Sequence, residues 1–214
     1  MLSARRIPLI EDDICGNLAF DGSRPKVAKS FDTDGWVMLV ESFTKTVAPG
    51  YRLGWVAPGR FKERVEFLKW VNTAATASLP QMGLAEFLKT GGYEHLLRKL
   101  RKFYAKQSRL MSAAICRHFP EGTKVSRPAG GMMLWVELPS EFDAMEIYHR
   151  ALAEKITVAP GPIFSAKQGF QNFLRISFAM PWSETIERAV ARLGNIMATM
   201  KPCRKREDGE LIVA

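Results

Sequence analysis

The sequence predicts an α/β fold that is followed by a smaller α+β lobe. Over residues 1–92, short apolar segments alternate with amphipathic ones, as strands and helices do in α/β proteins. One long amphipathic segment, 93–118, then ends directly before Pro120 and is suited to connecting two lobes. Residues 119–200 again mix strand-type and helix-type segments, and 201–214 form a charged tail.

The elements of each lobe can be placed from their periodicity and their turn residues. In the first lobe the pattern predicts strands at about 7–12, 36–42 and 52–57 and helices at about 59–72 and 80–89. Pro80 suits the first turn of the second of these helices. In the second lobe we expect strands near 123–127, 132–137 and 173–178, and helices near 141–154 and 182–200.

Composition indicates a globular chain. Hydrophobic residues make up 47% of the 214 residues, which is enough for a sizeable core. No apolar run approaches the length of about 18 residues that a membrane-spanning helix needs. The first ten residues lack the apolar centre of a signal peptide. We therefore expect a cytoplasmic protein without a membrane partner.

The cysteines, the histidines and the distribution of charge indicate neither a disulfide framework, nor a metal site, nor a nucleic-acid-binding surface. The three cysteines (Cys15, Cys116, Cys203) and three histidines show neither a disulfide framework nor metal-ligand spacing. The net charge of +9 is concentrated in 98–106, on an amphipathic segment, and in 201–206. A solvated helix face and a charged terminus account for both, so we expect no direct binding of nucleic acid by this segment.

The most informative segment is SFTKTVAPGYRLG at residues 42–54, which we call the lysine loop. It places Lys45 at the end of a predicted strand, where we expect its amine to be buried. Desolvation, or a cation such as Arg52, lowers the pKa of a lysine amine from about 10.4 and lets the amine condense with an aldehyde. A guanidinium grips phosphate with two hydrogen bonds, and the hydroxyls of Ser42 and Thr44 suit its other oxygens. The lysine loop therefore predicts pyridoxal 5'-phosphate, a cofactor with both groups.

The lysine loop resembles the lysine signature of the fold-type I, class I and II aminotransferases. The likeness is greatest to the branch that holds the aminotransferase-like domains of MocR/GntR-type regulators and the 2-aminoadipate or kynurenine-type transaminases. Further segments match the family in the expected order: PLIEDDICG at 8–16, GGYEHLLRKLR at 91–101, PAGGMMLWVELP at 128–139, then Pro160, Gly161, Phe164 and FLRISF at 173–178. The resemblance implies the C-terminal part of a cofactor-binding large domain with a mostly parallel sheet (1–92), a connecting helix (93–118) and a small α+β domain (119–200).

The resemblance also implies roles for single residues. Asp12 would pair with the pyridine nitrogen of the cofactor and keep it protonated, while Asp13 would cap the turn. Lys45 would carry the cofactor and then move a proton between substrate and cofactor. Arg175 would clamp the α-carboxylate of the substrate. The alternatives are that Asp12 only caps a turn and that Arg175 only lies on the exposed face of an edge strand.

Cys15 departs from the family pattern, which has a tyrosine at this position. The phenol hydroxyl donates a hydrogen bond to the ring oxygen of the cofactor, whereas a thiol is a weak donor on a shorter stem. Cys15 is therefore expected to lie at the cofactor but to support transamination less well.

The chain is shorter than the catalytic unit of the family. Alignment by motif implies that the first half of the large domain does not belong to these 214 residues. We expect an open sheet edge and much exposed apolar surface, and hence a chain that is unstable alone or associates. Members of the family are dimers with shared sites, so a homodimer is expected where the large domain is complete.

The sequence thus predicts the C-terminal part of an aminotransferase-like protein, which transfers an amino group between an amino acid and a 2-oxo acid. Two alternatives remain open. The chain could be the effector-binding domain of a MocR-type transcriptional regulator, which binds the cofactor without turnover, or a degenerate fragment that no longer binds it.

Overall fold

The computed structural model describes residues 2–200 and divides them into two compact units. Unit 1 runs to Phe103 and includes Ala129–Gly131, and unit 2 contains Tyr104–Pro128 and the described residues from Met132 onward. The division falls inside one long helix. The expected boundaries at residues 92 and 118 stay a prediction, and the expected charged tail, 201–214, lies outside the described residues.

Unit 1 contains a three-stranded sheet in the order β1-β2-β3. Strand β1 (Leu9–Asp12) runs parallel to β2 (Val37–Ser42), and β2 runs antiparallel to β3 (Gly54–Ala57). Asp12 pairs with Val40, so the carboxyl ends of β1 and β2 lie at the same edge of the sheet. The lysine loop begins at this edge, because Ser42 is the last residue of β2.

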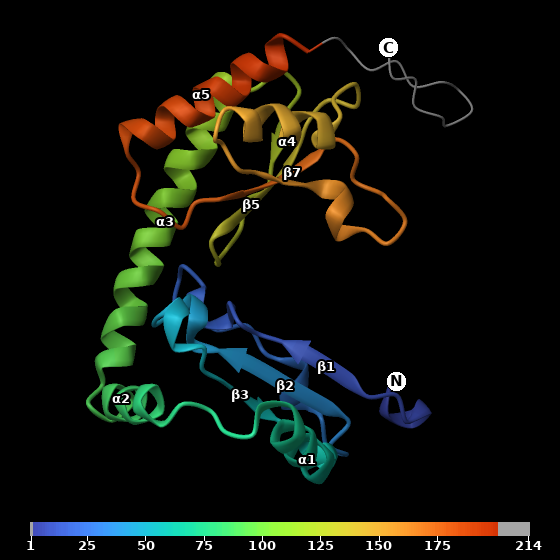
Figure 1. Cartoon of the computed structure of the whole chain (residues 1–214), viewed down its shortest axis with the longest axis vertical. Helices are drawn as coiled ribbons and strands as arrows, with labels where there is room; N and C mark the ends of the chain where they lie inside the picture. The colour runs from blue at the N-terminus through green and yellow to red at the C-terminus, as the bar shows by residue number, and fades with distance from the viewer. Residues whose placement is uncertain (1, 201–214) are drawn as a thin grey trace. The chain divides into compact units, whose positions relative to one another are not determined.

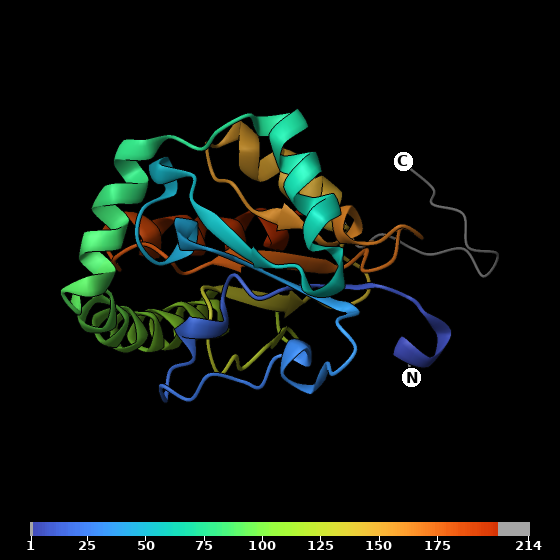
Figure 2. The ribbon, with the colours of Figure 1, turned by 90° about the horizontal axis from the view of Figure 1, so that it is seen from below.

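The helices of unit 1 bury little. Helix α1 (Lys62–Thr73) follows a 3-10 turn, Gly59–Phe61, and lies beside the three strands in Figures 1 and 2; none of its residues is buried. Helix α2 (Ser78–Lys89) buries only Leu84. It begins two residues earlier than predicted, because proline is tolerated throughout a first turn, where the amide hydrogens have no partner within the helix. Further 3-10 turns of unit 1 are Ser3–Arg5, Gly16–Leu18, Ala28–Phe31 and, in the lysine loop, Pro49–Tyr51.

Helix α3 (Gly92–His118) matches the predicted connecting segment to within one residue. Its buried side chains recur at helical spacing, since Leu97 packs within unit 1 while Tyr104, Met111 and Ile115 pack within unit 2. Arg117 and His118 lie in its last turn, where positive charge is favourable.

Unit 2 is an α+β unit around an antiparallel sheet in the order β4-β5-β7-β6. The strands are β4 (Lys124–Val125), β5 (Met133–Glu137), β6 (Ala159–Pro160) and β7 (Phe173–Ser177). The short strand β6 was not predicted. Two residues are too few for a periodic signal, and Pro160 argues against a strand unless that strand lies at an edge, as β6 does.

One face of this sheet forms the core of unit 2. The alternating residues Leu134, Val136, Leu174 and Ile176 are buried. Helices α4 (Ala144–Ala153) and α5 (Glu184–Ala198) lie on the same side of β5 and β7 (Figure 1). Both are shorter than predicted, because Asp143 and Ser183 cap their N-termini with side-chain oxygens. At Gly194 a Cβ atom would lie 2.0 Å from the carbonyl oxygen of His118, so only glycine permits α5 to cross the end of α3 there.

The segment Ala129–Gly131 is hydrogen-bonded to residues 18–20, at the end of the 3-10 turn that follows β1. Gly130 forms an isolated antiparallel bridge with Ala19, and the Phe20 amide donates to the Ala129 carbonyl at 2.8 Å. A Cβ atom on Gly130 would lie 2.8 Å from the Leu18 carbonyl oxygen. Glycine at this position therefore allows the two backbones to meet.

Candidate active site

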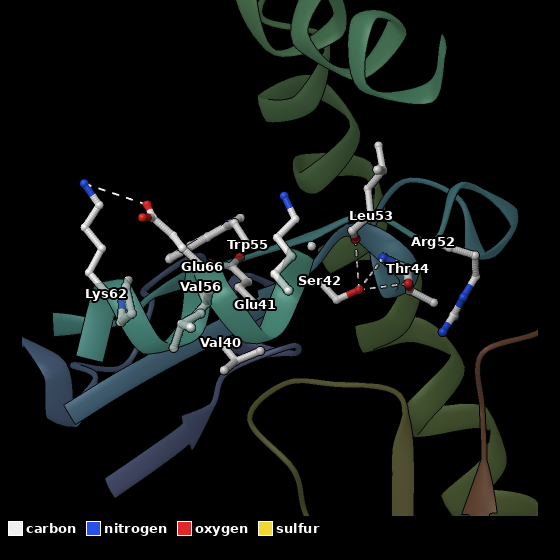
Figure 3. Close-up of a pocket in the computed structure, with 14 residues that line it drawn as sticks. Val40, Glu41, Ser42, Thr44, Arg52, Leu53, Trp55, Val56, Lys62 and Glu66 are labelled. Carbon is white, nitrogen blue, oxygen red and sulfur yellow. Dashed lines mark hydrogen bonds and ion pairs between the residues drawn. The ribbon is translucent and has the colours of Figure 1, made fainter. Parts of the chain in front are cut away.

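The lysine loop leaves β2 through a short 3-10 helix, Phe43–Lys45, that Ser42 caps. The Ser42 hydroxyl accepts a hydrogen bond from the Thr44 amide at 3.1 Å and lies 2.8 Å from Thr44 Oγ1 and 3.2 Å from the Leu53 carbonyl. The Phe43 amide donates to the same carbonyl at 3.0 Å. The start of the loop is thereby closed onto its end, as the dashed lines around Ser42 show in Figure 3.

Lys45 lies at the last position of this 3-10 helix and is exposed. The expectation of a buried Lys45 amine is therefore wrong for the part of the chain that the structure describes. The apolar neighbours in the sequence belong to a strand that ends three residues earlier, so they do not cover the lysine side chain.

Cys15, Asp12 and Lys45 lie close enough for their charges to interact. Burial raises the pKa of the Cys15 thiol, the positive charge of Lys45 opposes this increase, and the negative charges of Asp12 and Asp13 add to it. Cys15 thus lies within electrostatic range of Asp12 at the end of β1 and of Lys45 at the end of the 3-10 helix. The raised pKa keeps the thiol protonated at neutral pH.

Asp12 is exposed at the end of β1, and its carboxylate accepts a weak hydrogen bond from the Ile14 amide at 3.3 Å. Asp13, which was expected to cap the turn, instead binds the Arg24 guanidinium, with Arg24 Nε at 3.1 Å from Asp13 Oδ2. The expectation for Asp13 was wrong, because an arginine eleven residues away provides its carboxylate with a charged partner. The Asp12 carboxylate, with one weak hydrogen bond, keeps most of its accepting capacity for a ligand.

Arg52 follows the 3-10 turn Pro49–Tyr51 and adopts a left-handed backbone, with φ 51°. This conformation is uncommon for a residue other than glycine and turns the chain sharply into β3. Arg52, Ser42 and Thr44 line one cavity of about 700 Å³, which continues along β3 and α1 past Trp55 and Val56 (Figure 3). One guanidinium and two hydroxyls at a shared cavity are a donor set that fits a phosphate group.

Arg175 lies in unit 2, on β7, with its side chain exposed. Its guanidinium carbon is 4.3 Å from the centre of the Phe164 ring, and its register partner on β5 is Trp135. Trp135 also packs edge-on against Phe164, with ring centres 5.8 Å apart. The edge-strand alternative for Arg175 does not hold, because β7 lies between β5 and β6.

Sequence reasoning missed a group of polar residues beneath the lysine loop. Glu41 is buried on β2 and binds Asn17 and Arg24, while Tyr93 at the start of α3 binds Asn17 and Thr46. One signal was available: Glu41 alternates with the buried Leu39, so a carboxylate occupies an inward position of the strand.

The comparison with protein families identifies the family of this chain. The family described as aminotransferase class I and II matches residues 1–193. The chain belongs to the class I and II aminotransferases. Membership of this family confirms the resemblance and the α/β fold that the sequence predicted.

Individual relatives match almost the whole chain. It is 39% identical to the uncharacterized HTH-type transcriptional regulator YjiR of Escherichia coli, over 88% of this chain and 40% of that protein. It is 32% identical to the 2-aminoadipate transaminase of Thermus thermophilus, over 92% of this chain and 50% of that protein. The crystal structure of LysN, the α-aminoadipate aminotransferase of T. thermophilus in complex with N-(5'-phosphopyridoxyl)-L-leucine, superposes with a TM-score of 0.85 at 30% identity and covers 92% of this chain and 52% of that one.

The chain therefore spans about half the length of the relatives that it matches. In the described part of the chain, no helix is both long and apolar enough to cross a bilayer.

Proposed function

We propose that this chain is the C-terminal part of a pyridoxal-phosphate-dependent aminotransferase, acting on an amino acid and a 2-oxo acid. The observation that carries the proposal is the lysine loop: Lys45 directly follows Thr44, which lines one cavity together with Ser42 and Arg52, and the loop begins at the end of a parallel strand pair. When bound, the cofactor supplies an aldehyde carbon for an amine and a ring that accepts an electron pair. All other steps fall to the side chains of the protein.

Each side chain has one task in this proposal. Ser42, Thr44 and Arg52 would hold the phosphate, and the Asp12 carboxylate would keep a proton on the ring nitrogen. The Lys45 amine would hold the cofactor covalently through its aldehyde carbon, whose oxygen would leave as water, and would afterwards accept and return the proton of the substrate α-carbon. Arg175 holds the substrate carboxylate, and its guanidinium is oriented by the Phe164 ring.

Cys15 sets the expected rate. Its thiol is protonated and donates hydrogen bonds weakly, so it stabilises the ring oxygen of the cofactor less than a phenol does. We expect covalent binding of the cofactor with slow amino transfer. We also propose that the protein works in the cytoplasm as a homodimer where its large domain is complete, which the family resemblance supports.

The test is covalent capture of the cofactor. The chain is incubated with pyridoxal 5'-phosphate, the visible absorbance of the adduct is followed, and borohydride then fixes it for peptide mapping. We expect capture by the wild type and none at residue 45 of Lys45→Ala. Lys69→Ala is the matched control, because Lys69 lines the same cavity in a different element. Undiminished capture by Lys45→Ala would exclude the proposed cofactor site.

A second candidate function is binding of cofactor and an amine by the effector domain of a MocR-type regulator. The 39% identity to YjiR and the cysteine at position 15 favour it. A panel of amino acids with 2-oxoglutarate separates the two. Transfer of the amino group supports the enzyme, whereas capture without transfer supports the regulator. A chain that captures no cofactor at all is the degenerate fragment.

A further inference from the structure

Glu41 is a buried carboxylate for which the proposed mechanism has no use. It lies on β2 directly before Ser42 and is only 6% exposed. The Asn17 amide donates to one of its oxygens, and Arg24 Nη2 lies 3.1 Å from the other. A buried carboxylate is costly unless it is paired and hydrogen-bonded, so Glu41 requires these partners to remain where it is.

The Arg24 guanidinium extends this contact to the end of β1. Its Nε and Nη2 atoms bind Asp13, and its Nη1 atom donates to the Asn17 side-chain oxygen at 3.2 Å. A single planar group therefore joins the turn after β1, the 3-10 turn Gly16–Leu18 and the end of β2. A lysine could not reproduce this, since it has no rigid fork of donors.

Tyr93 connects the network to Thr46, the residue that follows the 3-10 helix in the lysine loop. Its hydroxyl accepts from the Asn17 amide at 3.3 Å and donates to Thr46 Oγ1 at 3.4 Å. Thr46 is 5% exposed, and the Tyr93 ring packs edge-on against Phe43 with 5.8 Å between ring centres. Burial raises the pKa of the Tyr93 phenol, so it remains a donor at neutral pH.

The network residues are chain neighbours of the proposed site residues. Asp13 follows Asp12, Glu41 precedes Ser42 and Thr46 follows Lys45. Two of the charged site residues, Asp12 and Lys45, are exposed, so their own packing does not fix them. The anchored backbone on either side therefore limits where the Asp12 carboxylate and the long Lys45 side chain can reach.

We propose that Asp13, Asn17, Arg24, Glu41, Thr46 and Tyr93 form a positioning network that fixes the end of β1 and the lysine loop relative to each other, so that the Lys45 amine, the Asp12 carboxylate and the Ser42 hydroxyl face one bound cofactor. None of the six acts on the cofactor itself. The inference rests on the proposed function, because it concerns how the same site is kept in place.

The experiment measures the initial rate at which pyridoxal 5'-phosphate is captured at Lys45 of the whole chain. After borohydride reduction, peptide mapping gives the adduct at Lys45 and, as an internal reference, at the exposed Lys124 of unit 2. Small displacements of a reacting group can cost about 100-fold in rate, so we expect capture at Lys45 to fall by about 10- to 100-fold in Glu41→Leu and in Arg24→Met. Capture at Lys124 should not change.

Two further variants test whether a loss of capture at Lys45 comes only from a general loss of stability. Tyr93→Phe removes one hydroxyl and keeps the ring, so it folds even if Glu41→Leu does not, and we expect a smaller loss of capture at Lys45. Leu84→Ala removes a buried side chain of unit 1 outside the network, so we expect it to lower the stability of the unit while the network contacts remain. We expect it to capture cofactor at Lys45 at the wild-type rate at temperatures where it is folded.

The outcomes separate the two proposals. If the wild type captures cofactor at Lys45 no faster than at Lys124, the cofactor site and the positioning network both fail. If the wild type prefers Lys45 but Arg24→Met and Tyr93→Phe keep that preference, only the network fails. A loss in Leu84→Ala as large as that in the network variants also overturns the network, because general stability then explains the effect.

Discussion

The two units keep their structure by different means. In unit 2, five residues of α5 are buried, and β5 and β7 each bury their inward side chains completely or nearly so. In unit 1, α1 has no buried residue, and Phe67, Trp70 and Val71 on it are exposed by 51%, 69% and 57%. Neighbouring exposed apolar side chains of this kind are unusual on a monomeric soluble protein and mark an interaction surface.

In unit 1, hydrogen bonds and ion pairs of three carboxylates connect segments that are held by little apolar packing. Asp32 binds Lys29 and two backbone amides, Glu11 accepts from the amides of Ala28 and Lys29, and Glu41 is held by Asn17 and Arg24. Such contacts fix geometry but contribute less net free energy of unfolding than apolar burial does. Polar contacts therefore fix the local geometry of unit 1, while apolar side chains on its helix α1 remain exposed.

The largest expected effect comes from removing apolar packing in unit 2. Leu174 is fully buried on β7, so Leu174→Ala should lower the free energy of unfolding of unit 2 by about 2–5 kcal/mol. Leu68→Ala makes the same chemical change on α1, where the side chain is 41% exposed, and should cost about 0.5 kcal/mol or less. Native-state hydrogen exchange of β5, β7 and β2 amides measures both. Equal losses would contradict the difference between the units.

An intermediate effect is expected at the helix ends. Asp143 Oδ1 accepts from the amides of Met145 and Glu146 at 2.7 and 2.9 Å, whereas α1 has no side-chain cap. Asp143→Ala should lower the free energy of unfolding of unit 2 by about 1 kcal/mol. Glu141→Ala, which removes the same charge from a nearby exposed position, should leave it unchanged in the same urea titration. A similar loss in both variants would assign the effect to charge rather than to capping.

The smallest expected effect on the free energy of unfolding at neutral pH concerns the titration of Asp32 in unit 1. The hydrogen bond from Lys29, aided by the Val37 and Trp36 amides, lowers the pKa of Asp32 to about 2. A lowered pKa means that this carboxylate stabilises the unit above its unfolded pKa of about 3.9 and loses that contribution as the pH falls toward 2. Between pH 7 and 5 we expect no change.

A carbon-detected NMR titration of the Asp32 carboxyl measures this midpoint. Lys29→Met should move the midpoint upward, toward the ordinary value for aspartate. A wild-type midpoint near the ordinary value of about 3.9 would show that unit 1 lacks the well-made polar contacts that distinguish it from unit 2.

Local patterns predicted most of the fold. The amphipathic pattern that includes Leu97 and Tyr104 was enough to place α3, an apolar stretch placed β2, and alternation placed β7. These signals are local, because each depends on residues within one element. The parallel pairing of β1 with β2 and the antiparallel course of β3 depend on the whole sheet, and the first of these was expected only from the family resemblance.

The site was predicted less completely than the fold. The motif indicated Lys45 and Arg52, but the exposure of Lys45 depends on which elements surround it, and no local pattern carries that information. The network joins Asn17 to Glu41 and to Tyr93, which are 24 and 76 residues away along the chain. Contacts of this separation follow from tertiary packing, so only the inward position of Glu41 gave a local hint.

The bridge between Ala19 and Gly130 has a consequence for how the chain can be divided. The polypeptide passes from one unit to the other after Phe103, after Pro128 and again after Gly131. A protease that cuts once, between Phe103 and Tyr104, would therefore not release two independent pieces. The fragment that begins at Tyr104 would retain Ala129–Gly131. The backbone of this segment is hydrogen-bonded to Leu18 and Phe20, which belong to the other fragment.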